Sequence, residues 1–123
     1  MTTIGILGAG QLGRMLALAG YPLGLSFRFF DPAPDSPAGV LAEHIVAAYD
    51  DQPALARFVT GLDAVTYEFE NVPVETLRFL EQSVPIFPPP VALEKGQDRL
   101  TEKIFFKSLG IPTPDFLEVS SKM

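Results

Sequence analysis

The sequence contains no cysteine, no tryptophan and a single histidine, His44. Without cysteine the chain can form no disulfide and can offer no thiolate as a nucleophile or metal ligand. One histidine alone also leaves too few of the side chains that zinc prefers. These absences exclude thiol chemistry and predict no metal site. Because disulfides mark oxidising compartments, we expect a cytoplasmic protein.

Basic residues and long apolar runs are also scarce. Nine Lys and Arg residues stand against fifteen Asp and Glu residues, which gives a formal net charge of −6. An acidic chain without a basic run is a poor candidate for nonspecific nucleic-acid binding. The apolar stretches fall short of the ~18–20 residues of a membrane-spanning helix. No basic segment precedes the first apolar run, which we therefore interpret as a core strand and not as a signal peptide. We expect neither nucleic acid nor membrane as a partner.

The most informative stretch is a glycine-rich loop, Gly8-Ala9-Gly10-Gln11-Leu12-Gly13, which follows an apolar run and matches the pattern G-x-G-x-x-G. Strand, tight turn and helix in this order direct backbone N–H groups and the positive helix end toward one point. The loop therefore predicts a phosphate-bearing ligand, although the pattern alone does not identify it. Arg14 lies one turn further, where it either adds positive charge or belongs to a solvated helix face.

Short apolar runs alternate with segments of helical spacing along the first 87 residues. The expected strands are 3–7, 25–30, 42–47, 63–67 and 84–87, and the expected helices are 11–23, 51–60 and 73–82. Alternating units with short connections predict an α/β fold, a Rossmann-like parallel sheet with helices on both faces. In the first helix we expect the large apolar side chains to pack on the sheet: Leu12, Met15, Leu16, Leu18 and Ala19.

A proline run, Pro88-Pro89-Pro90, then breaks the alternation. We expect one domain over residues 1–89, and a linker helix with the first elements of a second domain over 90–123. Asp98 is placed to cap the helix that follows it. Arg99 lies on that helix, where it is either suited to a phosphate or part of an exposed charged face. An extended segment is expected over 115–119.

Acidic residues follow two of the expected strands. Asp31 ends the second strand, where a dinucleotide-binding fold places an acid on a ribose hydroxyl; before Pro32 it can equally start a turn. Glu68 and Glu70 follow the fourth strand, so they are expected at the same sheet edge as the glycine loop. Two carboxylates there can accept hydrogen bonds from sugar hydroxyls or an amine, and a nicotinamide enzyme has no particular use for such a pair.

Three segments in this order resemble one family: GAGQLGRM at 8–15, TYEFENVP at 66–73 and QDRLTEKIFFKSLGIPTP at 97–114. They are similar to the N-terminal region of the N5-carboxyaminoimidazole ribonucleotide synthetases, ligases of the ATP-grasp superfamily, and the resemblance covers essentially the whole chain. It implies a Rossmann-like pre-ATP-grasp domain, then an ATP-grasp domain and a small C-terminal domain, in a homodimer. It also implies carboxylation of 5-aminoimidazole ribonucleotide with bicarbonate, ATP and Mg²⁺, through carboxyphosphate, in de novo purine biosynthesis.

The resemblance also implies roles for individual residues. It places the substrate phosphoribosyl group at Gln11 and Leu12, the acidic substrate-binding position at Glu68 and an ATP contact at Arg99. The metal-binding acids, the ATP-binding lysines and the lid over the nucleotide would lie beyond Met123, so no catalytic or metal-binding residue is expected here and the chain alone is expected to be inactive. Two alternatives remain, an NAD(P)-binding domain of an oxidoreductase and a noncatalytic dimerising or regulatory module. Weaker candidates for substrate binding, supported mainly by position, are Gly10, Asp31 and Glu70.

Overall fold

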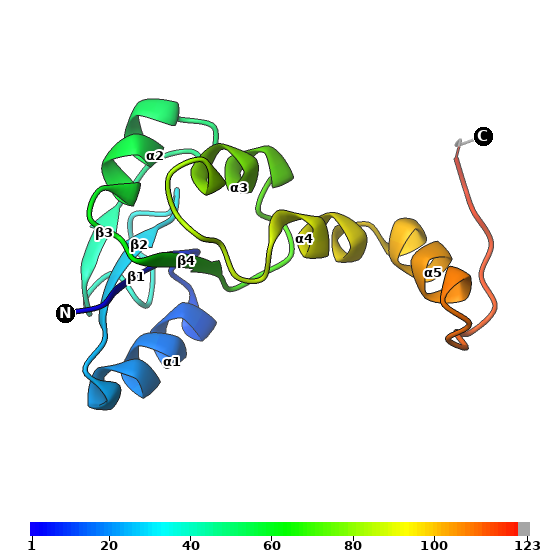
Figure 1. Cartoon of the computed structure of the whole chain (residues 1–123), viewed down its shortest axis with the longest axis horizontal. Helices are drawn as coiled ribbons and strands as arrows, with labels where there is room; N and C mark the ends of the chain where they lie inside the picture. The colour runs from blue at the N-terminus through cyan, green and yellow to red at the C-terminus, as the bar shows by residue number, and fades with distance from the viewer. Residues whose placement is uncertain (121–123) are drawn as a thin grey trace.

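A four-stranded parallel sheet forms the centre of the molecule (Figure 1). The structure is a computed structural model, and it describes residues 1–120. Neighbouring strands lie in the order β3-β2-β1-β4, so the first strand is central. This order and the parallel pairing confirm the predicted Rossmann-like α/β class. The strands are β1 Thr3–Leu7, β2 Ser26–Phe30, β3 Glu43–Ile45 and β4 Ala64–Tyr67.

Helices cover both faces of the sheet, and each face has its own hydrophobic core (Figure 1). One core includes Ile6 and Phe29 of the sheet and Ala17 of α1. The other includes Leu7 and Phe30 of the same strands. Successive strand residues point to opposite faces, which is why adjacent residues belong to different cores. The helices are α1 Gln11–Gly20, α2 Gln52–Val59, α3 Val74–Glu81, α4 Pro90–Gln97 and α5 Arg99–Ser108, and a 3₁₀ turn, Tyr21–Leu23, follows α1.

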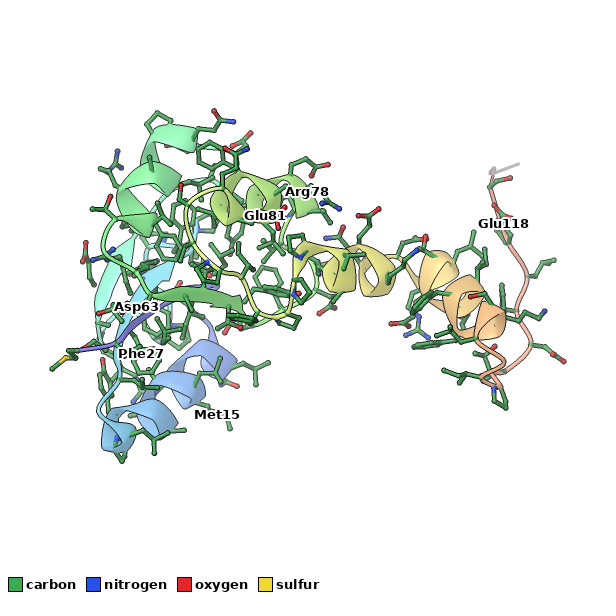
Figure 2. All side chains as sticks on the ribbon, in the orientation of Figure 1. Met15, Phe27, Asp63, Arg78, Glu81 and Glu118 are labelled. Atoms are coloured by element: carbon green, nitrogen blue, oxygen red, sulfur yellow. The ribbon has the colours of Figure 1, made fainter. Side chains whose placement is uncertain are left out.

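Helix α1 packs on the sheet with its small residues, contrary to the expected orientation. Its buried residues are Gly13, Ala17 and Gly20, while Leu12, Met15, Leu16, Leu18 and Ala19 are exposed. Figure 2 shows Met15 on the outer side of α1 and Phe27 on the sheet side. The aromatic rings of Phe27 and Phe29 in β2 already fill the space between the sheet and the helix. Only residues with a small side chain or none therefore allow α1 to approach the sheet closely.

The expected fifth strand, 84–87, is not formed. Only an isolated bridge between Val65 and Ile86 remains, with hydrogen bonds from Val65 N to the Pro85 carbonyl and from Phe87 N to the Val65 carbonyl. Pro85 has no N–H to donate and Pro88 follows directly, so a regular ladder cannot extend here. Val84 and Ile86 are nevertheless buried against the core.

Helix α4 packs against the sheet unit, whereas α5 projects away from it (Figure 1). Leu93 of α4 is buried in the core beside α2 and α3, although the domain boundary is predicted before this helix. Helix α5 has no buried residue. The segment 115–119, expected to be extended, forms no strand. Within residues 1–120, no helix is both long and apolar enough to cross a membrane.

Candidate functional site

The glycine loop holds a carboxylate of its own chain. The side chain of Glu68, which follows β4, accepts a hydrogen bond from Gly10 N at 3.0 Å through Oε1 and another from Gly13 N through Oε2. Both donors lie at the start of α1, where the helix dipole stabilises a negative charge. These two N–H groups, which the sequence predicts to face a phosphate, therefore bind Glu68 instead.

The glycines of the loop leave room for this carboxylate. A Cβ at Gly10 would lie 2.8 Å from Glu68 Oε1, and a Cβ at Gly13 would lie 2.9 Å from Oε2. Gly8 has a φ of 98°, and a Cβ there would overlap the Glu68 Cγ. A side chain at any of the three positions would displace Glu68.

Asp31, at the end of β2, is directed toward the same loop. Its Oδ2 accepts from Ala9 N at 2.9 Å, and its Oδ1 accepts from Ala33 N at 2.8 Å. The second bond closes a turn over Pro32, as expected of an aspartate before proline. Ala38 N also donates to the Ala9 carbonyl at 2.9 Å, so the peptide groups of Ala9 are bound from both sides. Asp31 therefore fixes the loop.

A half-buried tyrosine, Tyr49, lies near the two carboxylates. Within residues 1–120, the hydroxyl of Tyr49 is the one buried side-chain polar atom without a hydrogen-bond partner. Burial raises the pKa of this hydroxyl, and the negative charges of Asp31 and Glu68 raise that pKa further. The Tyr49 ring packs against Phe30 and Phe69, with centroids 5.7 and 6.2 Å away. No motif identifies Tyr49 in the sequence, because its place depends on the loop path after β3.

Two surface grooves meet at Glu68. One, of about 470 Å³, runs along α1 and is lined by Leu12, Met15, Leu16, Ala19, Tyr67 and Glu68. The other, of about 350 Å³, lies between the loop after β4 and helix α4. Glu68 thus lines both grooves: the mostly apolar groove along α1, and the groove beside α4, which Glu70 lines as well.

The remaining candidates are placed as follows. Gln11 and Leu12 are exposed at the first turn of α1, and within the described chain their N–H groups have no hydrogen-bond partner. Glu70 is exposed, and its carbonyl accepts from Gln97 Nε2 at 3.0 Å. Arg14 is turned toward the loop after β2, where its Nη1 donates to the Pro37 carbonyl at 3.1 Å.

Arg99 is separate from this group. It is exposed at the start of α5, which projects away from the sheet (Figure 1). Asp98 caps this helix as predicted, accepting from Thr101 N and Thr101 Oγ1, both at 2.9 Å. Across residues 1–120, no three His, Asp or Glu side chains gather where they would hold a metal ion.

Comparisons with known proteins agree with this architecture. Residues 1–97 match the family model of the ribonucleotide synthetase preATP-grasp domain. An N5-carboxyaminoimidazole ribonucleotide synthase of Pseudomonas aeruginosa is 56% identical over 119 residues, which are 97% of this chain and 33% of that protein.

Solved structures give the same result. The crystal structure of an N5-carboxyaminoimidazole ribonucleotide synthetase from Thermus thermophilus has a TM-score of 0.88 at 65% identity, over 90% of this chain and 31% of that one. An Aspergillus clavatus N5-carboxyaminoimidazole synthase, solved in complex with ADP and 5-aminoimidazole ribonucleotide, has a TM-score of 0.82 at 29% identity, over 93% and 31% of the two chains. The chain thus spans about a third of the length of the relatives it matches, and it belongs to the ribonucleotide synthetase preATP-grasp domain family.

Proposed function

We propose that this chain is the substrate-binding N-terminal part of an N5-carboxyaminoimidazole ribonucleotide synthase. One observation carries the proposal: in a chain of this family, the Glu68 carboxylate is fixed at the carboxyl edge of the sheet between two open grooves. Ligands of open α/β sheets bind at that edge. The substrate class is a phosphorylated ribonucleotide, 5-aminoimidazole ribonucleotide.

Glu68 supplies a fixed acceptor for this substrate. Each carboxylate oxygen has two acceptor positions, and the bonds from Gly10 and Gly13 use one on each oxygen. The other positions accept from ribose hydroxyls. Because the loop already holds Glu68, little side-chain entropy is lost when the ligand binds.

The phosphoribosyl group is proposed to lie along the first turn of α1. The exposed N–H groups of Gln11 and Leu12 remain available there, and the side-chain amide of Gln11 adds a further donor. Gly10 and Asp31 serve this site by holding Glu68 and the loop, and direct contacts of Gly10, Asp31 and Glu70 with the substrate stay predictions.

The complete reaction needs groups from the rest of the enzyme. In it, bicarbonate attacks the γ-phosphate of ATP to give carboxyphosphate and ADP. The 5-amino group of the ribonucleotide then takes the carboxyl group and phosphate leaves. Mg²⁺ would neutralise charge on the phosphates, but the described residues do not gather a set of metal ligands. Arg99 is the one proposed ATP contact, suited by its planar guanidinium.

We further propose the division into a pre-ATP-grasp domain over 1–89 and the start of an ATP-grasp domain over 90–123. The complete enzyme is proposed to be a cytoplasmic homodimer. The chain alone is proposed to be inactive. A turnover assay with ATP, Mg²⁺, bicarbonate and the aminoimidazole ribonucleotide should show no ADP release above background, and release above background would overturn this last proposal.

Substrate binding can be tested directly by NMR. Titration of the ¹⁵N-labelled chain with 5-aminoimidazole ribonucleotide should shift the amide resonances of Gln11 and Leu12. These shifts should be lost in Glu68→Gln, which keeps the size of the side chain but removes its charge. Asp35→Asn is the matched control, because Asp35 is exposed on the loop after β2. Shifts confined to other regions, or an unchanged response in Glu68→Gln, would contradict the proposed site.

A further inference from the structure

The glycine loop has the sequence of a dinucleotide-binding turn, yet an internal carboxylate occupies the position where such a turn receives phosphate. We infer that Glu68 is a specificity determinant, an internal anion that keeps phosphate groups away from Gly10 and Gly13 and so makes this loop reject dinucleotides. The exclusion rests on the contacts of Glu68 alone. Its consequence for the orientation of the substrate rests on the proposed function.

The first support is steric. In a dinucleotide-binding turn, the absence of side chains lets the backbone approach the pyrophosphate. Here the same absence accommodates Glu68, since a Cβ at Gly10 or Gly13 would lie within 3.0 Å of one of its oxygens. The two N–H donors are already engaged by those oxygens. A phosphate can reach them only if Glu68 leaves.

The second support is electrostatic. Asp31 and Glu68 both direct carboxylates to the loop, and within residues 1–120 neither of them forms an ion pair. Backbone N–H groups hold both carboxylates, and no cationic side chain of the described residues neutralises their negative charge, which therefore opposes an incoming anion. Arg14, the nearest arginine in sequence, donates to the Pro37 carbonyl. The raised pKa of the Tyr49 hydroxyl has burial as its first cause and the charges of the two carboxylates as its next.

This arrangement determines which end of a ribonucleotide can face the loop. A hydroxyl group donates to a carboxylate, whereas a phosphate is repelled by it. The sugar hydroxyls of the proposed substrate therefore lie against Glu68. The phosphate of the substrate lies at the N–H groups of Gln11 and Leu12, and not at those of Gly10 and Gly13 that Glu68 already engages. A dinucleotide cannot bind in this orientation, because its pyrophosphate would have to approach the N–H groups of these glycines.

The test uses inorganic pyrophosphate and NAD as probes on the ¹⁵N-labelled chain, with the amide resonances of Gly10 and Gly13 as the readout. Neither probe should shift these resonances in the unmodified chain. In Glu68→Ala the donors are free, and pyrophosphate should give saturable shifts, with an affinity gain of about tenfold or more. Asp35→Ala removes the same charge from an exposed loop position and should behave like the unmodified chain.

Glu68→Gln serves as the second variant because it preserves the side-chain volume. Its amide offers a single acceptor oxygen and no charge, so its affinity for pyrophosphate should lie between those of the unmodified chain and Glu68→Ala. This variant decides the question should Glu68→Ala fail to fold. Should both variants fail, the unmodified chain decides: its Gly10 and Gly13 amides must be protected from exchange and unaffected by pyrophosphate.

Three outcomes would overturn the inference. They are pyrophosphate shifts at Gly10 and Gly13 in the unmodified chain, a folded Glu68→Ala chain that does not respond, and free exchange of the two amides. Failure of the proposed function is a separate result, because it is a lack of response to 5-aminoimidazole ribonucleotide while Glu68 is intact. Each result can occur without the other.

Discussion

The carboxylate of Asp31 accepts a hydrogen bond from Ala9 N at 2.9 Å and thereby ties the end of β2 to the loop that follows β1. The same carboxylate also accepts from Ala33 N on the other side. One side chain thus joins two loops at the edge where the ligand is proposed to bind. Asp31 therefore holds the backbone of the proposed site in its conformation, and it does so in the absence of a ligand.

Replacing Asp31 should therefore lower stability in the absence of any ligand. Asp31→Ala leaves two N–H groups without an acceptor, which should lower the free energy of unfolding by about 1–3 kcal/mol. Urea unfolding followed by circular dichroism measures the loss. The matched variant Asp35→Ala, at an exposed site, should change the value by less than about 0.5 kcal/mol. Equal effects of the two variants would contradict the role given to Asp31.

Arg28 offers a comparison of half-buried and exposed ion pairs. Its guanidinium contacts Glu43 at 3.0 Å and also donates to the carbonyls of Phe58 at 2.7 Å and Thr60 at 2.6 Å. Arg28→Met should lower the free energy of unfolding by about 1–3 kcal/mol, because the two carbonyls lose their donor. Arg78, labelled on α3 in Figure 2, pairs with exposed Glu94, and Arg78→Met should cost only about 0–1 kcal/mol. Chemical denaturation of the two variants in parallel measures both losses. A larger loss for Arg78→Met than for Arg28→Met would contradict this prediction.

The orientation of α1 can be tested through its outer face. Met15 and Leu16 are 62% and 44% exposed, so Met15→Gln and Leu16→Gln should each change stability by less than about 0.5 kcal/mol. Leu55, which is buried in α2, is the contrasting position, and Leu55→Ala should cost about 2–5 kcal/mol. Thermal unfolding monitored at constant protein concentration compares all three. A large loss for the α1 variants would mean that their side chains are covered.

The inner face of α1 should tolerate no enlargement. An alanine at Gly20 favours the helix by about 1 kcal/mol intrinsically, but its Cβ would overlap the ring of Phe27. We expect a net loss of about 1–3 kcal/mol from this overpacking. In a Phe27→Leu background the same change should cost less, because the two positions are coupled. An unchanged cost in that background would show that Phe27 is not the obstacle.

Helix α5 should depend on pH through its cap. The carboxylate of Asp98 accepts from Thr101 N and Thr101 Oγ1, and these bonds hold the pKa of Asp98 below its usual range. A depressed pKa stabilises the helix above the ordinary aspartate pKa of about 3.9, and this stabilisation is lost as the pH falls through the lower, folded-state value. Carbon chemical shifts across α5 should report the loss of helix in acid.

Asp98→Ala should show the frayed first turn of α5 at neutral pH already, with little further change on acidification. The control is Asp115→Asn, beyond the end of the helix, which should titrate like the unmodified chain. A pH-independent first turn in the unmodified chain would remove the capping role of Asp98.

Much of the fold could be predicted because local patterns and the fold agree. The alternation of short apolar runs with helical segments predicted the strands β1 to β4 in parallel order. Asp98 was expected to cap the helix that follows it, and its carboxylate accepts from Thr101 N, three residues further along the chain. Asp51, expected as the first residue of its helix, lies just before it and caps it in the same way by accepting from Ala54 N. These features depend on residues close in sequence.

The orientation of α1 could not be predicted from its own sequence. The helix has two faces of the same period, one with Gly13, Ala17 and Gly20 and one with the larger apolar residues. Size favours the larger face for burial, but the choice depends on Phe27 and Phe29 of β2, whose rings occupy the space. Only the packed structure contains that information.

The proximity of Glu68 to the glycine loop was predicted, but the hydrogen bonds between them were not. Glu68 and the glycine loop were expected at one edge, which the parallel sheet requires. That the carboxylate would enter the loop depends on the bend after Tyr67, where Glu68 N donates to the Leu7 carbonyl. This bend depends on a contact between two segments that are far apart in the sequence. Neither segment has a sequence pattern that would predict the contact.

The side chain of Gln97 connects helix α4 to the loop after β4. Its Nε2 donates to the carbonyls of Glu70 and Val72, at 3.0 and 2.7 Å, and so anchors the last residue of α4 to the loop that carries Glu68. Helix α4 is thus attached to the sheet unit both at its last residue and through the buried side chain of Leu93. Arg99 begins α5 only two residues after Gln97, so the proposed ATP contact is tethered by a very short stretch of backbone to the loop that carries Glu68.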